Sequence, residues 1–231
     1  MAQSGLQRPT PSPAAPSAGS SRLAGLLAGG TYGNELLTAV TGGLLIVLLA
    51  ALGVTIVRIG SLLWVHLFVG LLLMGPLALK LSSTGYRFVR YYTRNPRYVE
   101  HGPPELALRL IAPIVALSTL VVFVSGLVLL FAGPSSRRTW FPIHKDSFFV
   151  WVAFMAIHVL GHLPAVGAGL KADYGAALER DEYGVPGRSG RALALAGALV
   201  LGLVLALVLI PQFAPWVNAQ PHFHIHPPRP R

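Results

Sequence analysis

Five long apolar stretches constrain this chain more than any other feature of its sequence. They cover residues 36–57, 62–79, 110–132, 147–170 and 192–210. A helix needs about 20 apolar residues, at a rise of about 1.5 Å each, to cross the hydrocarbon core of a bilayer. Backbone groups in lipid must be paired within the segment, and the alternating pattern of barrel strands is missing. We therefore expect an all-α integral membrane protein with five transmembrane helices.

The composition supports this expectation and excludes several classes of protein. Of the 231 residues, 53% are hydrophobic and only 11% are charged, whereas a soluble domain carries about 25% charged residues. Cysteine is absent, which rules out disulfides, thiolate metal sites, iron–sulfur clusters and a cysteine nucleophile. The sequence also has no phosphate-binding loop and no nucleophile elbow, so a soluble hydrolase or nucleotide enzyme is excluded.

The apolar stretches lie between two segments of different composition. Residues 1–35 are rich in Pro, Ser and Gly, which predicts a disordered N-terminal tail. Residues 36–211 are predicted to form the five-helix transmembrane domain. Residues 212–231 are rich in His and Pro and are predicted to form a C-terminal tail. The first apolar stretch starts too late and is too long for a signal peptide, so we expect it to remain in the mature protein.

The distribution of basic residues predicts the orientation in the membrane. If the N-terminus is cytoplasmic, 12 of the 18 Lys and Arg residues fall on the inner side and 6 on the outer side. This excess favours a cytoplasmic N-terminus and an external C-terminus. It also accounts for the net charge of +10 without a nucleic-acid partner. The basic, aromatic segment 86–92 is predicted to be an inner loop that anchors the chain at lipid headgroups.

Histidines provide the only ionisable side chains within the apolar stretches. The second stretch contains His66; the fourth contains His158 and His162, and His144 precedes it. Ionisable groups in the membrane are costly and indicate function. His144 and His158 are 14 residues apart, which places them on nearly the same helix face, about 21 Å apart. This spacing is typical of a helix that supplies axial ligands to two haems. Spacing alone leaves open whether His66 pairs with His144 or with His158.

The histidines also carry a resemblance to a known family. His144-x13-His158-x3-His162 resembles the last core helix of bacterial cytochrome b561 and hydrogenase cytochrome b subunits, and His66-x3-Gly70 resembles their second helix. The resemblance implies a four-helix transmembrane bundle that binds haem b, here with a fifth helix added, in a bacterial-type plasma membrane. It further implies that His66 and His144 ligate one haem iron near the outer face, and that Gly70 leaves room for the macrocycle.

The chain departs from this family in its first helix. The resemblance implies an inner haem held by His158 and by a histidine of the first helix, but no histidine lies between Thr31 and Ile59. The cautious prediction is therefore one haem, with the second doubtful. His158 can instead form hydrogen bonds within the bundle or act together with His162. Asn34 and Thr38, the polar residues of the first helix, are poor haem ligands.

Three functions remain open at this stage. The first is a b-type cytochrome that transfers electrons between quinol and an outer-face redox partner, as a subunit of a membrane oxidoreductase. The second is a scaffold or assembly subunit without haem, in which the histidines form hydrogen bonds between helices. The third is a membrane metal-binding protein, in which His158 and His162 share a metal ion, or His222, His224 and His226 of the tail bind copper, nickel or zinc.

Overall fold

The computed structural model describes residues 30–99, 106–174 and 187–219, and all regular secondary structure in these ranges is helical. The long helices are α2 (Gly30–Val57), α3 (Ile59–Tyr92), α5 (Leu106–Ala132), α6 (Arg137–Tyr174) and α7 (Arg188–Val208). Each of the five contains a segment long and apolar enough to cross a membrane. The predicted all-helical fold with five such helices is therefore confirmed. Four short elements complete the described chain: α4 (Pro96–Val99), η1 (Pro134–Ser136), η3 (Ile210–Phe213) and α8 (Ala214–Asn218).

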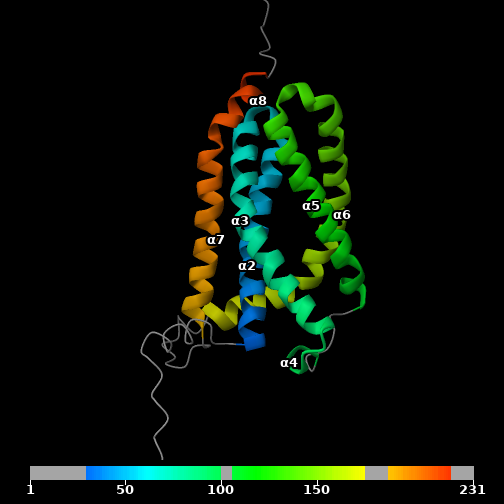
Figure 1. Ribbon diagram of the computed structural model, residues 1–231, viewed down its shortest axis with the longest axis vertical. Coiled ribbons are helices and arrows are strands. Elements are labelled where there is room, and N and C mark those ends of the chain that lie inside the picture. The colour runs from blue at the N-terminus through cyan, green and yellow to red at the C-terminus, as the bar shows by residue number, and fades with distance from the viewer. Residues whose placement is uncertain (1–29, 100–105, 175–186, 220–231) are drawn as a thin grey trace, which may run out of the picture.

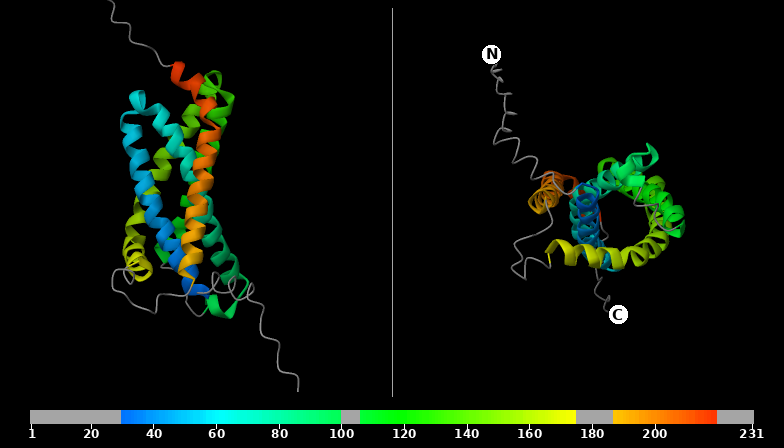
Figure 2. Two further views of the ribbon diagram at one scale, coloured as in Figure 1. Left: turned by 90° about the vertical axis from the view of Figure 1, so that its left-hand side faces the viewer. Right: turned by 90° about the horizontal axis from the view of Figure 1, so that it is seen from below.

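The long helices form an elongated up-and-down bundle (Figure 1). Helices α2, α5 and α7 run from the end near α4 to the end near α8, while α3 and α6 run in the opposite direction. Helix α3 packs against α2 and α7, α5 packs against α6, and α2 also contacts α6. Seen along the bundle in Figure 2, α2 lies between α7 and α5, and the last turns of α6 pass beside α2. Because α3 and α6 run in the same direction, they are parallel helices.

Several helices extend beyond the predicted apolar stretches. Residues 30–35, predicted as part of the disordered tail, form the start of α2, and the predicted inner loop 86–92 forms the last turns of α3. Helix α6 begins at Arg137, well before residue 147. Hydropathy marks only the part of a helix that suits hydrocarbon, whereas the backbone hydrogen bonds continue into the headgroup region. The boundaries predicted from apolarity were therefore too narrow.

The predicted C-terminal tail also begins too early, because residues 212–219 fold onto the bundle. Phe213 of η3 is only 1% exposed and packs in a buried cluster with Leu71, Leu130 and Ala206. The indole nitrogen of Trp216 in α8 donates a hydrogen bond of 3.2 Å to the carbonyl of Leu129. Through these apolar and aromatic contacts, η3 and α8 cover one end of the helices. The prediction of a tail from its His and Pro content did not include this packing.

Helix α7 packs so closely against α3 that the backbones of the two helices are in contact. A Cβ atom on Gly75 would overlap the carbonyl oxygen of Ala198, and one on Gly202 would overlap that of Leu72. Pro76 has no N–H group, so the Leu72 carbonyl one turn earlier loses its helical donor at the same place. Small residues allow membrane helices to pack closely. This contact fixes α7 against the helix that contains His66.

Candidate haem-binding site

Two of the predicted ligand histidines occupy equivalent positions on the parallel helices α3 and α6. His66 lies seven residues after Ile59, the first residue of α3, and His144 lies seven residues after Arg137, the first residue of α6. Both helices start at the end of the bundle near α8 (Figure 1). The two histidines therefore match in position along the chain from the helix starts, although the backbone of α3 is kinked at Leu62, between Ile59 and His66. Relative to the apolar stretches, His66 lies four residues inside 62–79 and His144 lies three residues before 147–170, which predicts a difference in depth of about 10 Å. Counted from the helix starts this difference disappears, because α6 begins earlier than its apolar part.

The ring of His66 is held by a threonine of the neighbouring helix. Nδ1 of His66 lies 2.9 Å from Oγ1 of Thr55 in α2. The single hydroxyl proton of Thr55 is donated to the carbonyl of Leu52, so Thr55 accepts and Nδ1 of His66 donates. A neutral imidazole protonated at Nδ1 has its lone pair on Nε2. Thr55 therefore orients His66 as a metal-ligand imidazole is oriented by its outer partner.

The ring of His144 is held in the same way by α5. Its Nδ1 atom lies 3.0 Å from the carbonyl oxygen of Val122 and 3.2 Å from the hydroxyl of Ser125. A carbonyl oxygen only accepts, so Nδ1 of His144 is the donor and Nε2 again has the free lone pair. Gly126 lies beside the ring, where a Cβ atom would be 3.0 Å from Cε1 of His144. Helix α5 thus supplies both an acceptor and the space for this imidazole.

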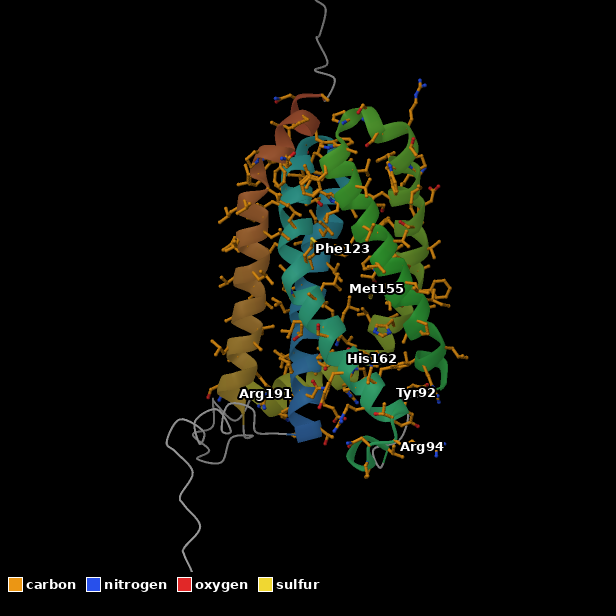
Figure 3. All side chains as sticks on the ribbon, in the orientation of Figure 1. Tyr92, Arg94, Phe123, Met155, His162 and Arg191 are labelled. Carbon is orange, nitrogen blue, oxygen red and sulfur yellow. The ribbon has the colours of Figure 1, made fainter. Side chains whose placement is uncertain are left out.

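The two rings lie within electrostatic range of each other, and both are half-buried. One turn after His66 the surface of α3 is open, since a Cβ atom on Gly70 would meet nothing within 4 Å. An apolar pocket of about 190 Å³ lies farther along, between α3 around Leu77 and α5 around Phe123. A larger hollow of about 580 Å³, lined in part by Tyr91 and Arg94, lies at the opposite end of the bundle (Figure 3). The larger hollow is remote from both candidate ligands.

The other two histidines of α6 lie deeper in the bundle. The rings of His158 and His162 are in contact, with centroids 4.6 Å apart, and Figure 3 shows His162 in the half of the bundle nearer α4. Nδ1 of His158 is buried and has no hydrogen-bond partner. Among the described residues, no three His, Asp or Glu side chains lie close enough together to hold a metal ion. A conventional three-ligand metal site around His158 and His162 is therefore not formed there.

A polar network between α2 and α3 was not anticipated from the sequence. Nζ of Lys80 donates a hydrogen bond of 2.7 Å to the carbonyl of Thr38, and the hydroxyls of Thr38 and Ser83 lie 3.0 Å apart. Nearer the α4 end, Arg87 and Glu35 form an ion pair of 3.0 Å. Lys80 lies just outside the predicted stretch 62–79, where a basic residue is expected at the membrane surface. Its position on a helix that continues to Tyr92 places it inside the bundle.

His222, His224 and His226 lie outside the described residues, so the structure does not test the predicted copper, nickel or zinc site of the tail. No protein-family model, curated protein or solved structure matches the chain. The resemblance to cytochrome b561 and hydrogenase cytochrome b subunits therefore rests on the histidine motifs alone.

Proposed function

We propose that this protein is a membrane b-type cytochrome that binds haem b between α3 and α6, with His66 and His144 as axial ligands. One observation carries the proposal. The two imidazoles lie seven residues after the starts of parallel helices, and each has its Nδ1 proton bonded to an acceptor, so both Nε2 lone pairs are available. Neutral imidazole is a good ligand for haem iron.

A pair of histidine ligands, His66 and His144, supports electron transfer rather than a reaction on a bound substrate. When haem is bound, its iron supplies one-electron oxidation and reduction. With His66 and His144 both holding the haem, the protein would offer the iron for electron transfer and not for binding a substrate. Thr55 and Val122 fix the two rings before the cofactor binds, and a preorganised ligand pair changes little between two oxidation states. Quinol and an outer-face redox protein are the electron-transfer partners that we propose.

The charges at the two ends of the bundle support an orientation. The end near α4 contains most of the Lys and Arg residues of the described chain, and the end near α8 contains few. We therefore propose that the α4 end faces the cytoplasm, following the positive-inside rule. In this orientation His66 and His144 lie near the outer surface of the membrane. An electron acceptor or donor outside the cell would thus be close to the haem.

Visible spectroscopy on the detergent-purified chain tests the proposal directly. The wild-type protein should be red, with the reduced α-band of b-type haem. His66→Ala and His144→Ala should each remove the spectrum of this haem. His101→Ala, in the chain between α4 and α5, is the matched control and should keep it. Size-exclusion chromatography and circular dichroism of each variant show whether the helices remain folded.

Two results would contradict the proposal. A colourless protein that is folded after expression with sufficient haem would favour the scaffold or assembly subunit, in which the two histidines only join helices through Thr55 and Val122. A coloured protein whose spectrum is unchanged in both His66→Ala and His144→Ala would place the haem elsewhere. The metal-binding alternative predicts retention of copper, nickel or zinc that is lost when residues 222–226 are deleted.

A further inference from the structure

The hollow of about 580 Å³ at the end of the bundle near α4 has no part in the proposed haem site. It is lined by Tyr91 and Tyr92 of α3, by Arg94, and by Pro96 and Val99 of α4. Figure 3 shows Tyr92 and Arg94 together at this end of the molecule. The volume lies in the range of ligand pockets, about 300–1,000 Å³. A guanidinium, two phenol rings and apolar side chains in one hollow suit a ligand that is both anionic and apolar.

Arg94 occupies a backbone position where glycine is the usual residue. Its φ is 56°, in the left-handed region, and the helix ends here with the N–H of Asn95 donating to the carbonyl of Arg90 at 3.1 Å. Non-glycine residues in this region are concentrated at ligand sites. Nε of Arg90 is buried without a hydrogen-bond partner among the described residues, so this turn also contains a donor that an anionic acceptor would satisfy.

Arg109 of α5 brings a second guanidinium to the hollow. Its Nη2 atom donates a hydrogen bond of 2.7 Å to the hydroxyl of Tyr92, and its guanidinium carbon lies 5.7 Å from the centre of the same ring. Of the side chains that the structure describes, Glu35 is the acidic one near this end, and it is paired with Arg87. Residues 86–109 contain five Arg and two Glu, so this part of the chain has a net positive charge.

An exposed strip on α3 connects the hollow to the apolar pocket of about 190 Å³ between α3 and α5. Leu81 lines this pocket, and Gly85, Phe88 and Tyr92 follow at intervals of four, three and four residues, so all four lie on one helix face. All four are exposed, and a Cβ atom on Gly85 would meet nothing within 4 Å. From Leu81 to Tyr92 the helix rises about 16 Å, close to the hydrocarbon thickness of one leaflet, about 15 Å.

We propose that an acidic phospholipid of the surrounding membrane binds at this place. Its phosphate group lies in the hollow against Arg94 and Arg109, and one acyl chain lies along the strip from Tyr92 to Leu81 and enters the apolar pocket. Arginine donates parallel N–H groups to phosphate oxygens, and tyrosine is favoured at the level of the headgroups. In the proposed orientation the site faces the cytoplasmic leaflet, where anionic lipids attract basic segments.

The length of the strip favours a phospholipid over a soluble phosphate, which would occupy the hollow alone. A bound lipid would also join two helices that pack mainly against other neighbours, since α3 packs against α2 and α7, and α5 packs against α6. The acyl chain would fill the space between α3 and α5, and the headgroup would hold their ends together through Arg94 and Arg109. This inference does not depend on the haem.

Native mass spectrometry of the full-length protein in detergent counts the phospholipids that each chain retains. The probes are phosphatidylglycerol, which is anionic, and phosphatidylcholine, which is zwitterionic, with the same acyl chains. We expect the wild type to retain one phosphatidylglycerol in preference to phosphatidylcholine. Arg94→Gln and Arg109→Gln should each weaken this binding about fivefold, as the loss of one Arg near anionic lipid implies. Arg137→Gln is the matched control, because this guanidinium also lies over a ring, 5.2 Å from Phe141, at the other end of the bundle.

A second pair of variants separates a phospholipid from a soluble phosphate. Leu120→Trp in α5 fills the apolar pocket and should weaken phosphatidylglycerol binding several-fold. Leu117→Trp is the control, because Leu117 is also exposed on α5 but does not line the pocket. Inorganic phosphate, which has no acyl chain, should not displace the lipid. Circular dichroism of each variant shows whether the helices remain folded.

Three results would overturn the inference. The first is equal retention of the two lipids by the wild type. The second is a preference for phosphatidylglycerol that is unchanged in both Arg94→Gln and Arg109→Gln. The third is displacement of the lipid by inorganic phosphate together with wild-type binding in Leu120→Trp, which would assign the hollow to a soluble anion. A chain that binds phosphatidylglycerol but no haem would contradict the proposed function and keep this inference.

Discussion

The backbone of Gly126 in α5 lies directly against the imidazole of His144 in α6. A Cβ atom at position 126 would be 3.0 Å from Cε1 and 3.4 Å from Nδ1 of this ring. The 3.0 Å contact is tighter than most contacts of real Cβ atoms, so a side chain here would push the imidazole by a few tenths of an ångström. The glycine therefore limits where the ring of His144 can lie, together with the hydrogen bond to Val122.

Gly126→Val should lower haem occupancy of the proposed His66–His144 site several-fold, because the added side chain moves the His144 ring away from the carbonyl of Val122. A shift of about 0.5 Å is enough to impair a preorganised ligand. The measurement is the haem-to-chain ratio together with the absorption spectrum. Gly197→Val is the control, since a Cβ atom at position 197 of α7 meets nothing within 4 Å. Equal occupancy in both variants would show that the ring tolerates the displacement.

Thr55→Val should weaken haem binding about 10-fold while leaving the helices folded, because the Nδ1–H group of His66 loses its acceptor. Valine has nearly the same shape as threonine, so packing is kept. Thr41→Val is a close control: Thr41 is also buried in α2 and its hydroxyl also donates to a carbonyl one turn earlier, at Leu37. Titration of the apoprotein with haem gives the affinities, and a tenfold loss in the control as well would contradict the assigned role of Thr55.

Gly75→Leu should strongly destabilise the bundle, by several kcal/mol, because its Cβ atom alone would overlap the carbonyl oxygen of Ala198. Thermal unfolding in detergent, followed by circular dichroism, should show a large fall in Tm. The matched control is Gly53→Leu in α2, where a Cβ atom meets nothing within 4 Å. An unchanged Tm for Gly75→Leu would mean that α7 can move away from α3 without cost.

Glu35→Gln should have little effect on stability, less than about 1 kcal/mol. The Glu35–Arg87 pair is 3.0 Å long, but the two side chains are 32% and 38% exposed, and ion pairs with access to solvent contribute little. The Tm of the variant should lie close to that of the wild type and should depend only weakly on salt. A fall of more than about 2 kcal/mol in the free energy of unfolding would show that water has much less access to this ion pair than the exposure of its side chains indicates.

The number and type of the long helices could be predicted from the sequence, because an apolar stretch of sufficient length has one stable form in lipid. The ends of the helices could not, since polar and aromatic residues continue a helix into the headgroup region without an apolar signal. Arg137 and Gly30 begin helices that hydropathy places later. This error in boundaries was also the source of the apparent mismatch in depth between His66 and His144.

The residues that hold the His66 and His144 rings were harder to predict than the two histidines. Histidines in apolar stretches stand out, but Thr55 and Gly126 resemble the small and hydroxylated residues that occur throughout membrane helices. Their role depends on which helices are neighbours, and this is determined by packing rather than by any local pattern. Lys80 was missed for another reason: a basic residue after an apolar stretch normally marks the membrane surface, and here the helix continues for three more turns.

Because Gly75 and Gly202 place the backbones of α3 and α7 against each other, the fifth long helix is a structural support for the helix that contains His66, and not an appendage to a four-helix core. Without α7, the surface of α3 around Pro76 would be exposed to lipid, and the carbonyl group of Leu72 would have no neighbouring helix against it. A minimal version of this protein made for laboratory use should therefore retain α7, even if every ligand it needs comes from the other helices.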